Sequence, residues 1–101
     1  MKINEQCMKD ILIFIDENTS AKVITYSNND IEMKAPAVST ILLNLSKDNK
    51  YSIEEVAYNF VKCYKLNYVD ANLYFQGKII KSAQSDVYGI TGYGEQFIKE
   101  H

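Results

Sequence analysis

Apolar side chains recur every three or four residues between Ser52 and Leu66, a spacing that predicts an amphipathic helix over 52–66. Its apolar stripe consists of Ile53, Val56, Ala57, Phe60, Val61 and Tyr64. Ser52 and Glu55 have the spacing of a capping box, in which the hydroxyl accepts from a first-turn amide and the carboxylate accepts from the amide of the cap residue. Asn67 tolerates the left-handed conformation that ends many helices. This capped helix is the best-defined element of the chain.

Helical spacing predicts three further helices. The first covers 4–17 with Asn4 as its N-cap, and the last runs over 91–100 with Thr91 as its cap. A short helix is predicted over 37–46, after Pro36. The β-branched residues in that segment leave a strand open as the alternative.

Alternation of apolar and polar residues predicts two β-hairpins. The first covers 22–35, with strands over 22–26 and 30–35 and a polar turn over 27–30. Its second strand is expected to be half-buried through Ile31, Met33 and Ala35. The second hairpin covers 68–90, with strands over 69–75, 78–82 and 86–90. In its first strand, the inward-facing residues are expected to be Val69, Ala71, Leu73 and Phe75.

The order of these elements is helix, strand pair, helix, capped helix, hairpin and helix. It predicts an α+β fold of the small winged helix type, in which residues 1–101 form one domain. The fold would consist of a helix-turn-helix, a β-hairpin wing over 68–90 and a closing C-terminal helix. The capped helix would then occupy the position that reads DNA in helix-turn-helix proteins.

Composition and charge limit the class of protein. An apolar content of 47% and a charged content of 24% are typical of a globular domain. The longest apolar run, 11–15, is too short to span a membrane, and the charged N-terminus does not resemble a signal peptide. We therefore expect a cytoplasmic bacterial or phage protein without membrane contact. In that compartment, Cys7 and Cys63 are expected to be free, buried thiols.

The sequence does not predict catalysis. The chain has one histidine, His101, which is expected to be frayed at the C-terminus, so that no Ser/His/Asp or Cys/His arrangement can form. A zinc site would need ligands beyond this imidazole and two distant cysteines. Gly89, Gly92 and Gly94 do not follow the order of a dinucleotide fingerprint. We expect no enzyme, and no catalytic, cofactor-binding or metal-binding residue.

Double-stranded DNA is one possible partner, bound as by a winged helix transcriptional regulator. Residues 47–81 contain six lysines against four acids, and Tyr58 and Asn59 are predicted to lie away from the apolar stripe, where they could reach a base edge. The candidate DNA-binding residues are Lys47, Lys50, Tyr58, Asn59, Lys62, Lys65, Lys78 and Lys81. Three observations oppose this role: Glu54 and Glu55 begin the capped helix, the chain has no arginine, and its net charge is −2.

A protein partner, or a second copy in a homodimer, is the favoured alternative. The chain has eight tyrosines, more than a domain of this size can bury, and tyrosine is enriched at the centres of interfaces. Tyr51, Tyr64 and Tyr68 are expected to be half-buried. Tyr74 and Tyr88 on the predicted wing are the candidate interface residues. The sequence therefore favours a non-enzymatic protein-interaction module.

Three segments resemble a family of short bacterial and prophage proteins, the domain-of-unknown-function family 2513. The first is Met1-Lys2 with Ile11-Leu12 and Ile15-Asp16-Glu17. The second is Tyr51-Ser52 with residues 54–58 and 66–71, and the third is Ile90-Thr91, Gly94 and Gln96-Phe97-Ile98. Residues 18–50 match poorly. The family usually has histidines where this chain has Asn59 and Glu95. The resemblance implies a winged helix fold and no particular activity.

Overall fold

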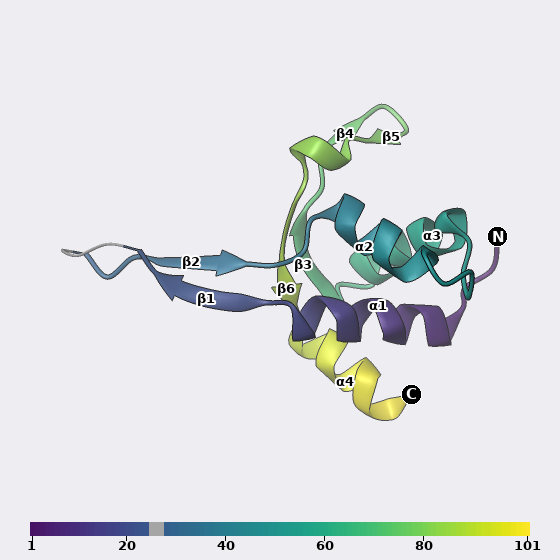
Figure 1. Ribbon diagram of the computed structural model, residues 1–101, viewed down its shortest axis with the longest axis horizontal. Coiled ribbons are helices and arrows are strands. Elements are labelled where there is room, and N and C mark those ends of the chain that lie inside the picture. The colour runs from purple at the N-terminus through teal and green to yellow at the C-terminus, as the bar shows by residue number, and fades with distance from the viewer. Residues whose placement is uncertain (25–27) are drawn as a thin grey trace.

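A computed structural model of the chain describes residues 1–24 and 28–101. It is an α+β structure with helices and short antiparallel strand pairs (Figure 1). The elements in chain order are α1 (Glu5–Glu17), β1 (Ser20–Val23), β2 (Ile31–Lys34), α2 (Val38–Ser46), α3 (Ile53–Lys65), β3 (Val69–Asn72), β4 (Phe75–Gln76), β5 (Ile79–Ile80), the 3₁₀ helix η1 (Ser82–Gln84), β6 (Asp86–Ile90) and α4 (Gly92–Glu100).

The predicted helices are confirmed together with their N-caps. The side chains of Asn4, Ser52 and Thr91 accept hydrogen bonds from backbone amides in the first turns of α1, α3 and α4. Segment 37–46 forms the helix α2, so the strand alternative is wrong. The capping box at Ser52 forms only in part, because the Glu55 carboxylate accepts from the Asn4 side-chain amide at 3.1 Å.

The end of α3 has the predicted left-handed residue. Asn67 has a φ of 61°, its amide donates to the Tyr64 carbonyl, and the Tyr68 amide donates to the Cys63 carbonyl. These two hydrogen bonds define a Schellman motif, which satisfies the last carbonyls of the helix. The chain thereby reverses directly into β3.

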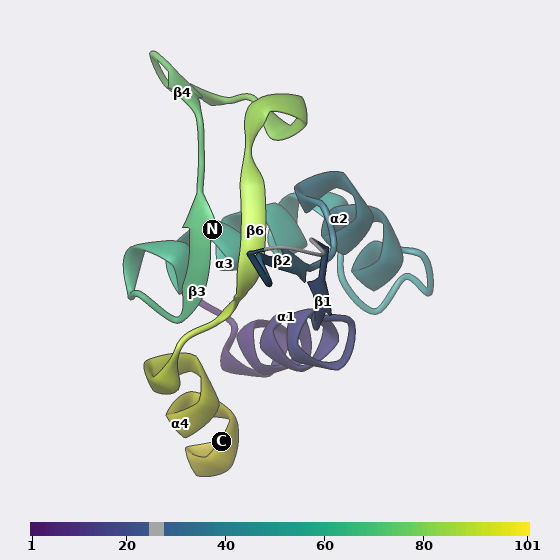
Figure 2. The same cartoon turned by 90° about the vertical axis from the view of Figure 1, so that its left-hand side faces the viewer.

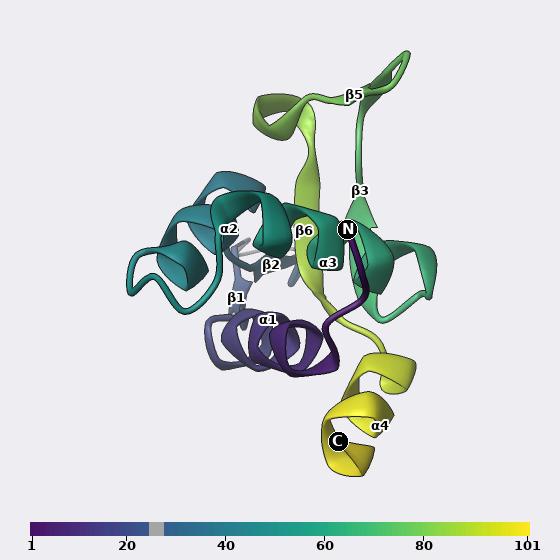
Figure 3. The same ribbon diagram turned by 90° about the vertical axis from the view of Figure 1, so that its right-hand side faces the viewer.

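The three helices α1, α2 and α3 pack on one another and enclose most of the core (Figure 3). Apolar faces at helical spacing meet at their centre because each amphipathic helix needs a partner for its stripe. The side chains that are almost completely buried there are Cys7, Met8, Ile11, Leu12, Ile15, Ile41, Val56, Phe60 and Cys63.

The second predicted hairpin forms as two strand pairs in line. β3 pairs with β6, and β4 pairs with β5 at the far end, where Gly77 begins the turn with a φ of 61° (Figure 2). We call the segment 68–90 the wing hairpin. The predicted strand 69–75 stops at Asn72, and Phe75 is exposed instead of inward-facing. The predicted strand 78–82 is reduced to β5, because η1 turns the chain back toward β6.

Helix α4 closes the molecule next to the end of α3. The Tyr68 and Phe97 rings lie 5.0 Å apart, and the Thr91 hydroxyl donates to the Asn67 carbonyl. The expectation that His101 is frayed is wrong. Its ring stacks on Phe97 at 4.1 Å, and its Nε2 lies 2.7 Å from the Glu5 carboxylate.

The first predicted hairpin forms, with β1 paired antiparallel to β2. The first strand begins earlier than expected, at Ser20, and β1 ends at Val23. Residues 25–27 of the predicted strand and turn lie outside the described residues. We call β1 and β2 together the arm, because they project from the helices along the longest axis of the molecule (Figure 1).

Candidate functional site

The arm has one apolar and one polar face. Its register places Ala21 opposite Met33 and Val23 opposite Ile31, so these four side chains share one face. Ser20, Lys22, Glu32 and Lys34 share the other face. Every residue of both strands is exposed, and the exposed fractions of Ile31 and Val23 are 66% and 61%. The apolar face of the arm is therefore not covered by the rest of the described chain.

The prediction that the 30–35 strand is half-buried is consequently wrong. Alternation along the strand correctly separates the two faces, but both faces lie in solvent. The reason is the position of the arm, which projects away from the helices instead of lying on them (Figure 1). Sequence reasoning thus missed Val23, Ile31 and Met33 as candidate interface residues, although their alternation identified the face.

A groove of about 330 Å³ lies where the base of the arm approaches β6. Met33 and Ala35 line one side, and Val87 and Tyr88 line the other. Tyr88 occupies a β-bulge, since Val87 pairs with Ala71 and Gly89 pairs with Asp70. Its side chain is 40% exposed, so this predicted interface residue presents an exposed ring to the groove, across from the base of the arm.

The other predicted interface residue, Tyr74, lies on the wing hairpin just before β4. It is 51% exposed, and the neighbouring Phe75 and Ile79 are also exposed apolar residues. Its backbone amide donates to the Ser85 hydroxyl, which holds this end of the wing hairpin together. The structure therefore places Tyr74 and Tyr88 on one hairpin but at different ends of it.

The predicted DNA-binding lysines come from three segments of the chain. Lys47 and Lys50 precede α3, Lys62 and Lys65 lie in its last turn, and the exposed pair Lys78 and Lys81 lies on the wing hairpin. The Lys50 ammonium lies 3.1 Å from the Asp10 carboxylate, and the Lys62 ammonium lies over the half-buried Tyr58 ring at 5.8 Å.

Asn59 was predicted to lie away from the apolar stripe, and this placement is wrong. Its exposed fraction is 0%. The side-chain oxygen accepts from the Asn4 backbone amide at 2.8 Å, and the side-chain nitrogen donates to the Glu55 carbonyl at 2.9 Å. A buried amide with these partners fastens the start of α1 to α3, and it is not available to a base edge.

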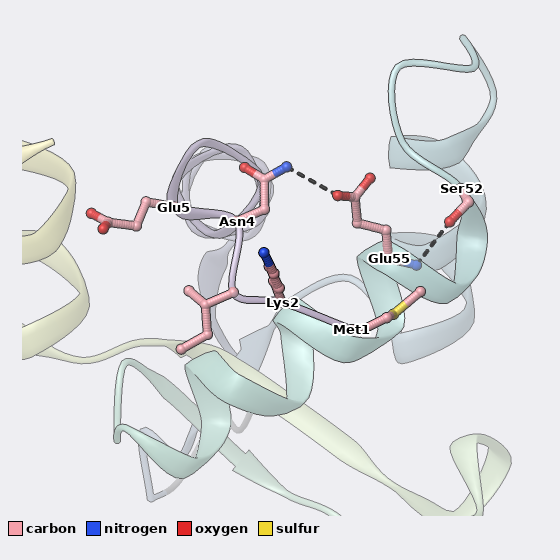
Figure 4. Close-up of a pocket in the computed structure, with 7 residues that line it drawn as sticks. Met1, Lys2, Asn4, Glu5, Ser52 and Glu55 are labelled. Carbon is pink, nitrogen blue, oxygen red and sulfur yellow. Dashed lines mark hydrogen bonds between the residues drawn. The ribbon is translucent and has the colours of Figure 1, made fainter.

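Another cleft lies beside Asn4, between the N-terminal segment and the start of α3. Its volume is about 540 Å³, and Met1, Lys2, Ser52 and Glu55 contribute to its lining. Figure 4 shows Asn4 turned toward Glu55, to which it is hydrogen-bonded. These polar groups connect the two helix starts, and the lining contains no histidine, cysteine or other nucleophile paired with a base.

A second polar contact connects the loop before α3 to α1. One oxygen of Asp10 accepts from the Tyr51 hydroxyl at 2.7 Å and from the Lys50 ammonium at 3.1 Å. Burial alone would raise the pKa of the Asp10 carboxyl, but hydrogen bonds from Tyr51, Lys50 and Gln6 outweigh burial and hold the pKa below its usual value. Burial, reinforced by Asp10, raises the pKa of the Tyr51 hydroxyl. The Asp10 carboxylate and the Tyr51 hydroxyl therefore satisfy each other, and their contact holds the loop before α3 on α1.

The prediction that Cys7 and Cys63 are free and buried is confirmed. Burial raises the pKa of each thiol to about 12, and the Glu55 and Asp10 carboxylates add to the effect at Cys7. Reactive cysteines have lowered pKa values and are accessible, so neither thiol has the character of a nucleophile.

We expect a thiol reagent to label both cysteines slowly in the native protein and rapidly in denaturant. The raised pKa values keep both thiols protonated in the folded state. The stability that the folded state gains from these protonated thiols is fully present below the ordinary thiol pKa of about 8.5. This stability declines as the pH rises above that value. Mass spectrometry of labelled Cys7→Ser and Cys63→Ser variants reports each thiol separately. Rapid native labelling of either one would show that its burial is wrong.

In residues 1–24 and 28–101, no helix has the length and apolar character needed to span a membrane. Over the same residues, no group of three or more histidine, cysteine, aspartate or glutamate side chains is arranged to hold a metal ion.

Comparison of the chain with family models, with curated proteins and with solved structures gave no match. The resemblance to the domain-of-unknown-function family 2513 therefore stays a prediction.

Proposed function

We propose that this chain is a non-enzymatic protein-interaction module on a winged helix scaffold. The uncovered apolar face of the arm is the observation that carries the proposal. Val23, Ile31 and Met33 are all exposed on this face. Contiguous apolar surface on an element that projects from a domain is typical of an interaction site. A partner that buries such a surface removes it from water, which is favourable.

The physical properties of a two-stranded hairpin strengthen this proposal. Two strands without a third strand or a covering helix are marginally stable in water. The arm has neither among the described residues, since β1 and β2 form a sheet of their own. A partner that covers the apolar face would add the missing layer. Tyr88 extends this surface across the groove to β6.

The winged helix scaffold is supported by the arrangement of the other elements. Helices α1, α2 and α3 pack together, and the wing hairpin follows α3 directly and pairs β3 with β6. The arm is an addition between α1 and α2. In this arrangement the wing hairpin, with Tyr74, is a second exposed element for contacts.

DNA binding is the competing function, and its support is limited to exposed lysines such as Lys65, Lys78 and Lys81. Two acidic residues, Glu54 and Glu55, occupy the first turn of α3. The burial of Asn59 removes the amide that was expected to read adenine. Asn59, one of the two residues expected to contact a base edge, is therefore not accessible to DNA.

Site-specific cross-linking in the native cell tests the proposal. A photoreactive phenylalanine analogue replaces Tyr88 or Tyr74 in the full chain, and Lys65, on the exposed last turn of α3, is the matched control position. We expect protein adducts, including adducts of the chain with itself, from Tyr88 and Tyr74 and none from Lys65.

Titration of random duplex with the unmodified chain completes the experiment. We expect no binding that weakens steeply with salt, because phosphate contacts produce such a dependence. Adducts to DNA from Lys65, together with tight salt-dependent duplex binding, would establish the competing function and overturn the proposed one.

A further inference from the structure

We propose that the arm pairs with the arm of a second copy of this chain. Strand β2 would lie antiparallel to β2 of the partner, with Met33 opposite the partner's Met33 on a two-fold axis. The product is a four-stranded sheet in the order β1, β2, β2 and β1. This inference rests on the proposed function, in which the arm is the interaction surface, and it names the partner.

The backbone of β2 is the first feature that supports this pairing. The Ile24 amide donates to the Asp30 carbonyl at 2.9 Å, and the pairs continue from Val23 with Ile31 to Ser20 with Lys34. In an antiparallel ladder, hydrogen-bonded pairs alternate with pairs whose amides and carbonyls point outward. Ile31 and Met33 therefore direct their backbone groups away from β1. Because β2 pairs only with β1 among the described residues, this outer edge can accept another strand.

The order of charged residues on the arm also supports this pairing. With Met33 on the axis, Glu32 faces the partner's Lys34, and Lys34 faces the partner's Glu32. Within one chain, Glu32 already lies opposite Lys22 on the same polar face. Opposite charges therefore alternate across the new sheet, and directly opposed unlike charges stabilise strand pairs.

Other two-fold registers lack this match. An axis at Glu32 would oppose two glutamates, and an axis at Lys22 on the outer edge of β1 would oppose two lysines. An axis at Ala21 on that edge places Lys22 opposite the partner's Ser20, which gives no ion pair. The charge pattern of the arm thus selects the edge of β2 and the register at Met33.

The groove beside Ala35 offers space and an apolar contact to the partner's arm. Antiparallel pairing about Met33 brings the partner's Ile31 opposite Ala35. Ala35 lines the groove of about 330 Å³ between the arm and β6, and Tyr88 lines its other side. The most exposed apolar residue of the arm, Ile31, would therefore lie where room and an exposed aromatic ring are present. A four-stranded sheet with a shared apolar face is also more stable in water than an isolated two-stranded hairpin.

Two proline variants test which edge pairs. Met33→Pro removes an outward amide on β2, and Ala21→Pro removes the equivalent outward amide on β1, so each leaves the ladder between β1 and β2 intact. Sedimentation of the full chain measures self-association. We expect a concentration-dependent dimer for the native chain and for Ala21→Pro, and a monomer for Met33→Pro.

Charge variants test the register. Lys34→Glu would oppose two pairs of like charges, and it should weaken dimerisation roughly 10- to 100-fold. Within its own chain, residue 34 faces the neutral Ser20, so the arm itself is little affected. Glu32→Lys should weaken self-association similarly. An equimolar mixture of the two variants should dimerise more tightly than either variant alone, because unlike charges then face each other at both positions between the chains. The mixture stays weaker than the native chain, since Glu32→Lys also places a lysine opposite Lys22 in its own arm.

Loss of dimerisation in Ala21→Pro but not in Met33→Pro would overturn the inference, as would a mixture that stays monomeric. Unchanged circular dichroism and melting of the helical body serve as the folding control for each variant. A native chain that is monomeric up to about 1 mM, which corresponds to less than about 4 kcal/mol of binding, overturns it too. If such a chain still gives protein adducts from Tyr88, only the identity of the partner is wrong. If the native chain neither dimerises nor gives protein adducts from Tyr88, the proposed function is overturned as well.

Discussion

Replacement of Phe60 by alanine is expected to lower the free energy of unfolding by about 3–5 kcal/mol. Phe60 lies on α3 between α1 and α2, and only 2% of it is exposed. A cavity of about 160 Å³ already lies beside it, lined also by Val38, Leu42 and Val61. Loss of the ring would enlarge this space, and three packed helices cannot collapse to fill it. Thermal and urea unfolding followed by circular dichroism measures the loss.

Leu43→Ala is the matched control for Phe60→Ala. It also shortens an apolar side chain on a helix, but Leu43 is exposed on α2. We expect a change within about 0.5 kcal/mol, as for most surface substitutions. Similar losses in the two variants would mean that the stripe of α3 does not face the core.

Gly94→Ala is expected to destabilise the protein by about 1–3 kcal/mol, as overpacking does. A Cβ atom added at Gly94 would clash with the Tyr68 carbonyl oxygen. That oxygen also accepts from the Thr91 amide at 3.0 Å, in the contact that places α4 against the start of β3. Because the obstacle is backbone and not a flexible side chain, relief requires a shift of α4. The measurement is again the unfolding free energy.

Gly92→Ala provides the opposite expectation two residues earlier in the same helix. A Cβ atom there would meet nothing within 4 Å, and the backbone does not need a positive φ. Alanine should therefore stabilise the chain by about 0.4–1 kcal/mol through the unfolded state. Equal effects of the two substitutions would show that the contact between α4 and Tyr68 is misplaced.

The sequence predicted the helices well because local forces decide them. A hydroxyl or amide side chain at the cap, a stripe at 3.6-residue spacing and a residue that tolerates positive φ all act within a few residues of one another. Ser52 and Asn67 were therefore assigned correctly before any tertiary contact was known. The close approach of Gly94 to the Tyr68 backbone, by contrast, was not visible in the sequence.

Polar residues on helices were harder to place. Asn59 follows Tyr58 in a helix whose stripe already accounts for the apolar positions, so the sequence indicated a surface amide. The structure buries Asn59, because its side-chain oxygen accepts from the backbone amide of Asn4 and its side-chain nitrogen donates to the backbone carbonyl of Glu55. Those partners come from two helices, and only their packing brings them together. The same holds for His101, whose neighbours lie on α4 and α1.

The sequence by itself determined the two faces of the arm, since alternation assigns side chains to opposite sides of any extended strand. It also determined the charge order of Lys22, Glu32 and Lys34 on the polar side. Only the tertiary structure decided that Val23, Ile31 and Met33 face solvent. The physical reason is that alternation records which residues share a face, whereas coverage of that face depends on where distant elements lie. In this chain the helices bury one another, and the arm extends beyond them.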